Sequence, residues 1–246
     1  MVSEPMARLL RALHAGGGGA ELATHCADVL GLDGVAVSLA TEGGSAELVF
    51  SVGEEASRFE DLQFTLGEGP GPDAMRSGLA VFEPEWGRPG ISARWPLLVP
   101  AAGDLPVRAV FCFPLSIGAI KVGVLTGVRL LPGGLSDTEW NEGRLLAETL
   151  TTLLLSRGAH VPYFPNGGSP ASSKEPWVLH RAVVHQATGM VSVQLGISLA
   201  EALLRLRAYA YGADRPIGAV AEDVVARRLR LEDDGYGPGL ADGGKE

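Results

Sequence analysis

Apolar positions recur along the chain with two periods, and each period predicts one type of element. Spacings of three and four residues indicate helices, whereas alternating or continuous Val-rich runs indicate strands. Before residue 157, helices are predicted in residues 4–14, 20–30, 73–78 and 137–156. Strands are predicted in residues 34–40, 48–52 and 80–83, with two more in residues 108–130 around a turn near Gly118. We expect Asp73 to cap the third helix through its carboxylate.

The rest of the chain begins with a change of composition. Residues 158–176 contain four prolines, three glycines and three serines without periodicity, which is typical of a linker. A helix is predicted next, with helical spacing at Leu179, Val183, Ala187, Met190 and Val191. A second helix begins with a capping box of Ser198 and Glu201, and a third begins at Pro216. One apolar stripe on each of the three helices can bury a common core.

These elements predict an α+β chain of two domains. An antiparallel sheet flanked by helices forms the N-terminal domain, and a small bundle of three helices forms the C-terminal domain. The expected parts are residues 1–19 for an N-terminal helix and Gly-rich stretch, 20–157 for the α+β domain, 158–176 for a flexible linker, 177–231 for the bundle and 232–246 for a disordered acidic tail.

Charge is distributed unevenly between these parts. The whole chain of 246 residues has a formal net charge of −9. Residues 177–231, in contrast, carry seven basic and four acidic side chains, a net charge of +3. A basic segment inside an acidic protein points modestly to an anionic partner such as nucleic acid, although a solvated arginine face explains the same charge.

Candidate chemistry for catalysis is missing from the sequence. Cys26 and Cys112 lie far apart and outside any metal-binding spacing, so we expect two buried thiols. Nucleophile, phosphate-binding and paired-carboxylate motifs are also absent, so we expect neither enzyme activity nor a cofactor or metal. No apolar run is long enough for a membrane span, and the N-terminus does not look like a secretory signal. The expected location is the cytoplasm, without a membrane partner.

Two parts of the sequence resemble known families. The order "QATG", a Met, "LGIS-AEAL-RLR-YA" and "R-I--VAEDVV", spread over residues 178–229, resembles the ANTAR domain, a three-helix module that binds RNA in bacterial transcription antiterminators. Upstream, "FTLGEGPGPDAMRSGLAVFEPE" and the strand order around it resemble the GAF sensory domain in the form fused to ANTAR modules in actinobacteria, over about residues 20–157. The resemblance implies an antiterminator that binds RNA hairpins in nascent transcripts under the control of a sensory domain.

The ANTAR resemblance also implies where RNA would bind. Small residues around Gln186, Ala187 and Gly189 let an RNA backbone approach closely, and nearby cations would meet its phosphates. Thr188 stands where the family usually has Lys, and Gln194 stands where Arg or Lys is often found. The expected RNA-binding residues are His185, Gln186, Ala187, Thr188, Gly189, Gln194, Arg181, Arg205, Arg207 and Arg215.

Several alternatives stay open at this point. Ala187 and Gly189 serve either RNA contact or close helix packing. The GAF resemblance implies either an unknown small-molecule effector or a dimerisation module, and surplus leucines in residues 139–156 suggest a homodimer. A "GEGPGPDA" loop can cradle an anion through its N–H groups or simply turn the chain. The alternative function for the whole chain is a dimeric signalling protein that senses a ligand and no longer binds RNA.

Overall fold

The computed structural model describes residues 2–15, 20–41, 46–156 and 181–231, without the side chains of residues 20–23. Two compact units make up the chain: Met1–Arg181, here called the sheet unit, and Ala182–Glu246, here called the helical unit. The predicted linker and acidic tail lie outside the described residues, as do residues 16–19 of the predicted Gly-rich stretch. These parts and the predicted domain boundaries stay predictions.

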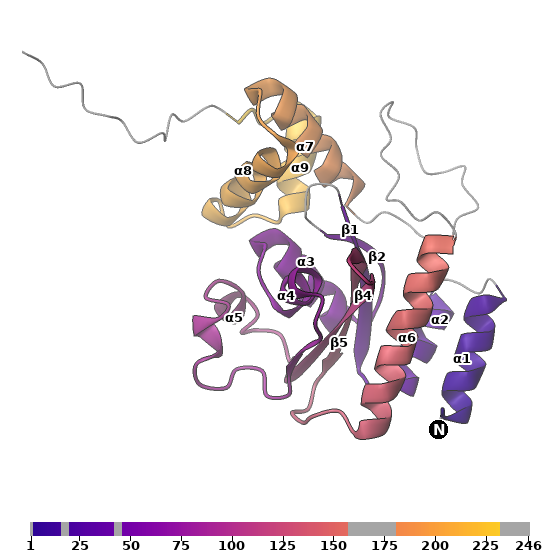
Figure 1. Cartoon of the computed structure of the whole chain (residues 1–246). Coiled ribbons are helices and arrows are strands. Elements are labelled where there is room, and N and C mark those ends of the chain that lie inside the picture. Colours follow the sequence, from indigo (N-terminus) through magenta and orange to yellow (C-terminus); the bar gives the residue numbers. More distant parts are fainter. Residues whose placement is uncertain (1, 16–19, 42–45, 157–180, 232–246) are drawn as a thin grey trace, which may run out of the picture. The chain divides into compact units, whose positions relative to one another are not determined.

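The sheet unit is built on five antiparallel strands in the order β2-β1-β5-β4-β3 (Figure 1). The strands are β1 (Gly34–Ala40), β2 (Ala46–Val52), β3 (Val81–Glu83), β4 (Ala109–Ile117) and β5 (Ile120–Arg129). The helices are α1 (Glu4–His14), α2 (Ala20–Val29), α3 (Glu54–Leu66), α4 (Pro70–Ser77), α5 (Leu98–Ala101) and α6 (Asp137–Ser156), with a 3-10 turn at Ile91–Ala93. This confirms the predicted α+β class and the predicted strands.

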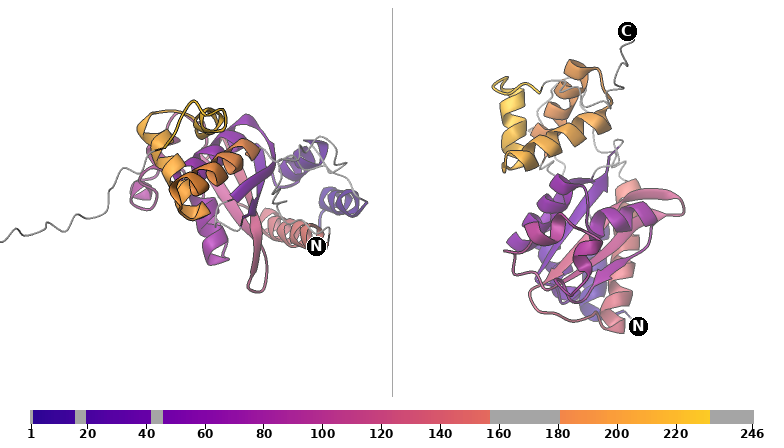
Figure 2. Two further views of the ribbon diagram at one scale, coloured as in Figure 1. Left: turned by 90° about the horizontal axis from the view of Figure 1, so that it is seen from above. Right: turned by 90° about the vertical axis from the view of Figure 1, so that its left-hand side faces the viewer.

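Helices cover both faces of the sheet, as Figure 2 shows from the side. One face packs against α1, α2 and α6, and the other against α3, α4 and α5. Successive residues of a strand point to opposite faces, so a strand buried on both sides must be apolar throughout. In β4, Phe111 and Phe113 enter the first core, while Val110 and Cys112 enter the second. This explains why the run "AVFCFPL" reads as continuously apolar instead of alternating.

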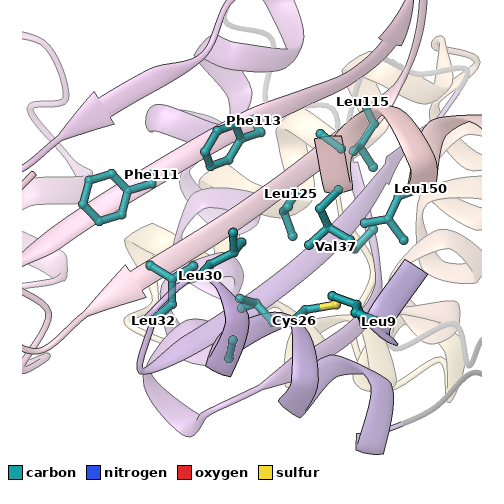
Figure 3. Packing of buried hydrophobic residues seen from close by; sticks show 14 of the residues in the cluster. Leu9, Cys26, Leu30, Leu32, Val37, Phe111, Phe113, Leu115, Leu125 and Leu150 are labelled. Carbon is teal, nitrogen blue, oxygen red and sulfur yellow. The ribbon is translucent and has the colours of Figure 1, made fainter. Parts of the chain in front are cut away.

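The first core joins parts of the chain that are far apart in sequence (Figure 3). Leu9 of α1, Cys26 of α2 and Leu150 of α6 lie among the sheet residues Val37 and Leu125. Each fully buried side chain of this size stabilises the fold by roughly 1.5–3 kcal/mol. The N-terminal helix is therefore an integral part of the sheet unit and not a separate segment.

Helix α3 was not predicted from the sequence. Two polar residues on its inner side, Glu60 and Gln63, are buried together with Phe59 and Ala56. They interrupt the apolar spacing from which a helix is recognised. The helix ends at Gly67, which adopts the left-handed conformation that favours glycine, with φ of 71°.

The prediction for Asp73 was wrong. Helix α4 begins at Pro70, with Gly69 as its N-cap, so Asp73 lies inside the first turn instead of before it. Its carboxylate accepts hydrogen bonds from Arg76, Arg94 and the indole N–H of Trp95. The Gly71 N–H in the same segment donates to the Gln63 side chain at 2.8 Å. This amide of the "GEGPGPDA" loop therefore serves an internal contact between α3 and α4.

Most leucines of α6 face the sheet. Leu146, Leu150 and Leu154 are buried in the first core, and Leu145 and Leu153 pack against it half-buried. Only the last of the helix's leucines, Leu155, is exposed. The apparent surplus of leucine is thus used within the unit, and a homodimer stays a prediction.

The helical unit consists of α7 (Ala182–Leu195), α8 (Leu199–Gly212) and α9 (Ile217–Val225), which pack pairwise against one another. Its α8 begins with the predicted capping box, in which the Ser198 and Glu201 side chains each bond the other residue's backbone N–H. No single described helix is long and apolar enough to cross a membrane. Helices α7 and α8 pass such a test only as a pair, and they bend by 108° at the break between them.

The environment of the two cysteines predicts their reactivity. Both are fully buried free thiols, and burial raises the pKa of Cys26 to about 12 and the pKa of Cys112 further still. Because the thiolate is the reactive form, neither should react with a disulfide reagent in the folded protein. Both should react once denaturant is added, in a colorimetric thiol assay. Rapid labelling of either thiol in native buffer would contradict the packing described here.

Candidate nucleic-acid interface

Helix α7 has one buried face and one outer face. The buried face carries Val184, Ala187, Thr188 and Val191. At the opposite positions lie Ala182, Gln186, Gly189 and Val193, spaced by four, three and four residues, all exposed except the half-exposed Gly189. Val193 is 86% exposed. The helix contains no Asp, Glu, Lys or Arg, so its outer face is smooth and uncharged.

Gly189 lies on this outer face. A Cβ atom built at this position would meet no atom of the described residues within 4 Å. Close packing inside the chain therefore does not require glycine here. Glycine in a helix interior costs roughly 1 kcal/mol of stability relative to Ala. Because packing inside the chain does not explain this cost, the open position is compatible with a ligand that approaches the backbone.

Ala187 and Thr188 lie on the opposite side. Ala187 is 0% exposed and Thr188 is 5% exposed, so neither side chain offers surface to a ligand. The Thr188 hydroxyl donates to the Val184 carbonyl one turn earlier, at 2.7 Å. We therefore correct the expected role of both residues: they belong to the core face of α7, and Thr188 satisfies its hydroxyl within the helix.

Gln194 connects α7 to the segment that follows α9. Its side-chain amide donates to the carbonyl of Leu231, which follows α9 and is itself buried. The residue thus holds the chain after α9 beside the C-terminal part of α7. Where a cation is often found in the family, this chain has a structural hydrogen bond.

Arg181 belongs to the sheet unit and is 5% exposed. Its guanidinium donates to the Asp61 carboxylate at 2.7 Å and lies 4.1 Å from the centre of the Phe64 ring. Its backbone N–H donates to the carboxylate of the buried Glu47 at 2.8 Å. Because these contacts engage its charge and its surface, the expected phosphate contact of Arg181 is also corrected.

The other expected residues differ in how far their side chains are accessible to RNA. Arg215 donates to the Asp223 carboxylate at 2.6 Å, and Arg205, Arg207 and His185 are half-buried and interact with other groups. Gln186 and Gly189 are the predicted residues that the structure leaves on one accessible surface of α7.

The structure also exposes a stripe on α8 that the expected RNA-binding residues do not include. Leu204 and Tyr211, seven residues apart, are 64% and 60% exposed. Their spacing places them on one side of the helix, away from the buried Leu203 and Leu206. A helical projection of residues 199–212 would have revealed the stripe. An exposed tyrosine can stack on an unpaired RNA base.

A separate polar network lies inside the sheet unit, on the face that α3 and α4 cover. The buried Glu60 carboxylate accepts hydrogen bonds from the Ser38 hydroxyl at 3.1 Å and the Gln63 amide at 2.9 Å. Nearby, the Cys112 thiol donates to the Thr126 hydroxyl at 3.6 Å. Strands β1, β4 and β5 and helix α3 each contribute a polar group to this network.

The electrostatics of Glu60 follow from its burial. Burial raises the pKa of its carboxyl, while hydrogen bonds from Thr126 and Ser38 and the charge of Arg181 oppose that rise. Asp61 adds a small like-charge contribution in the upward direction. A buried carboxyl of this kind takes up its proton more readily in the folded protein than in the unfolded chain.

Comparison with known proteins agrees with both units. Residues 178–225 match the family model of the ANTAR domain. The GAF domain of a phosphoenolpyruvate-protein phosphotransferase from Acinetobacter superposes with a TM-score of 0.51 and 13% identity, over 65% of this chain and 96% of that chain. The GAF domain of a Coxiella burnetii phosphoenolpyruvate-protein phosphotransferase gives a TM-score of 0.47 and 16% identity, over 64% of this chain and 100% of that chain. A search of curated protein sequences found no significant match.

These findings define the class of the protein. The sheet unit has the fold of a GAF domain, and the helical unit contains most of the residues that match the ANTAR family model. More specifically, the chain joins a GAF-fold unit to an ANTAR domain.

The two faces of α7 predict opposite responses to the same side chain. Ala187→Leu should destabilise the helical unit by roughly 1–3 kcal/mol, because the added methyl groups overpack a buried position. Gly189→Leu should leave its stability unchanged or raise it by up to about 1 kcal/mol, since Leu is a good helix former and the position is open. Calorimetry of the full chain checks both. Equal destabilisation by the two substitutions would contradict the orientation of α7.

The Glu60 network predicts a dependence of stability on pH. A carboxyl whose pKa is raised on folding stabilises the protein fully below its ordinary value of 4.5, and that contribution is lost as pH rises through the folded value. Relative to wild type, Glu60→Gln should therefore become more stable as the pH rises from about 4.5 to about 8. Urea unfolding followed by tryptophan fluorescence measures this, because Trp86, Trp95 and Trp140 lie in the sheet unit.

The matched control is Glu54→Gln, at an exposed position of the same helix. Its stability relative to wild type should vary little over this range, because its side chain is exposed and lies outside the buried network. If the difference in unfolding free energy between Glu60→Gln and wild type stays constant across the whole pH range, the pKa of Glu60 does not change on folding, and the prediction is wrong.

Proposed function

We propose that this protein is an RNA-binding transcriptional regulator, an antiterminator whose ANTAR domain binds RNA hairpins in nascent transcripts. The proposal rests on the match of residues 178–225 to the ANTAR family. It is supported by the three-helix bundle that these residues form and by the accessible surface around Gln186 and Gly189. Within this unit, residues 182–231 carry six basic and four acidic side chains, an excess of positive charge that favours an RNA ligand.

The GAF-fold unit is proposed as the sensor. In this role it binds an unidentified small-molecule effector and controls the ANTAR domain, with the chain acting as a homodimer in the cytoplasm. The proposed role of the protein is regulatory, without catalysis.

A second function is favoured by one observation. The outer face of α7 is uncharged, whereas an RNA-binding face usually presents cations to phosphates. Such a face also suits protein contact, and a dimeric signalling protein that does not bind RNA would use it in this way. The two functions differ in whether the chain recognises RNA structure.

Titration of the full-length protein against a pool of RNA hairpins separates them. For the antiterminator, hairpins should bind more tightly than a plain RNA duplex of equal length. Affinity should fall linearly with the logarithm of salt concentration, because phosphate contacts release counterions. Fluorescence anisotropy at three or more salt concentrations measures both effects. No preference over the duplex would favour the signalling protein.

A further inference from the structure

The end of α9 has an unusual residue at a position that favours glycine. All three helices of the ANTAR domain end in the same way, with one residue in the left-handed conformation: Gly196 at φ 66°, Asp214 at φ 50° and Arg227 at φ 58°. At the end of α9, the Arg227 N–H donates to the Val224 carbonyl and the Arg228 N–H to the Asp223 carbonyl. This is the Schellman arrangement, whose left-handed position is most often glycine.

The three residues differ in the strain that the left-handed conformation imposes on them. Glycine adopts the left-handed conformation without strain, and Asp tolerates it because its short side chain can bond locally. A long side chain such as that of Arg227 has no comparable local compensation. Strain held by a non-glycine residue is a reason to look for a function of its side chain.

The chain after Arg227 is held in place. Leu231 is buried, and its carbonyl accepts the hydrogen bond from Gln194 of α7. Leu229 also donates its N–H to the Asp223 carbonyl at 3.1 Å. The segment from Arg227 to Arg230 is therefore fixed at both ends, next to the C-terminal part of α7.

This segment concentrates exposed positive charge. Arg227, Arg228 and Arg230 are all exposed. Arg228 pairs with Asp223 at 2.6 Å, but Asp223 also pairs with Arg215, so this one carboxylate faces two guanidinium groups. Glu222 is the exposed acid in the last turn of α9. Among the described residues at this end of the domain, arginine side chains therefore outnumber acidic side chains.

We propose that Arg227 and Arg230, with Arg228 beside them, form a contact site for the phosphate backbone of an RNA hairpin. The inference rests on the proposed function and extends it to residues beyond the family match, which ends at residue 225. Guanidinium groups suit phosphate because they donate several hydrogen bonds in a fixed plane. The site lies beside Gln194, and so it supplies cations next to a position at which the α7 surface has none.

The test uses the full-length protein and the double variant Arg227→Gly, Arg230→Gln. Glycine fits the left-handed position better, so the melting temperature should stay the same or rise. Hairpin affinity should fall about ten-fold or more, since a hydrogen bond to a charged group is among the stronger ones. The loss should be similar for all hairpins, and the slope of affinity against salt should decrease by about one for each arginine lost.

Two control variants test whether any loss of affinity is specific to this site. Arg58→Gln with Arg144→Gln removes the same charge from exposed positions of the GAF-fold unit and should change affinity by less than about two-fold, because neither residue belongs to the proposed phosphate site. Arg227→Lys with Arg230→Lys keeps the charge and should retain most of the binding. These pairs separate a local phosphate contact from a general effect of net charge.

The possible results are distinct. If wild type binds hairpins and the Gly and Gln variant binds equally well, the phosphate site is wrong and the proposed function stands. If the variant melts at a lower temperature, the arginines stabilise the helix end, and the inference is also wrong. If wild type binds no RNA, or binds only vesicles of anionic phospholipid, both the proposed function and the phosphate site fail.

Discussion

The sheet of the GAF-fold unit must be buried on both faces, and most of the unit's architecture follows from this constraint. Strand β4 sends Phe111 and Phe113 to one side and Val110 and Cys112 to the other, so both sides need a cover of helices. Three helices from the two ends of the unit supply one cover, and α3, α4 and α5 supply the other. The N-terminal helix and α6 are consequently tied to the same core, although they lie far apart in sequence.

The same constraint explains the polar groups inside the unit. A cover made by α3 brings Glu60 and Gln63 against the sheet, where a lone carboxylate would be costly. Ser38 and Gln63 donate to that carboxylate, and the other end of the Gln63 amide accepts the N–H of Gly71. The network thereby connects strands, α3 and the start of α4 through one titratable group. The packing of the GAF-fold unit is therefore coupled to the protonation of the Glu60 carboxyl, whose pKa burial raises.

In the ANTAR domain the departures from the family pattern have structural uses. Thr188 takes part in the core face of α7, and Gln194 holds the chain that follows α9. The outer face of α7 then remains neutral, while exposed arginines gather after α9. Within the proposed function, two parts of one small domain have different roles. Helix α7 recognises the shape of the RNA, and the segment after α9 supplies the positive charge.

Local patterns were sufficient for much of the structure. Periods of two and of three to four residues predicted the sheet strands, α1, α6 and the three helices of the ANTAR domain, because each of these presents a continuous apolar face. The capping box at Ser198 and Glu201 was equally local, since both of its hydrogen bonds lie within four residues. The family resemblance added the domain type and the candidate surface around Gln186 and Gly189.

Only the tertiary structure decided the features that depend on distant partners. Helix α3 escaped prediction because Glu60 and Gln63 face the interior, which is favourable only where the sheet and α4 satisfy them. Arg181 looked like a free cation until Asp61 and Glu47, more than a hundred residues away, were found beside it. Sequence spacing shows which face of a helix a residue occupies, but burial and charge pairing depend on what the rest of the fold places against that face.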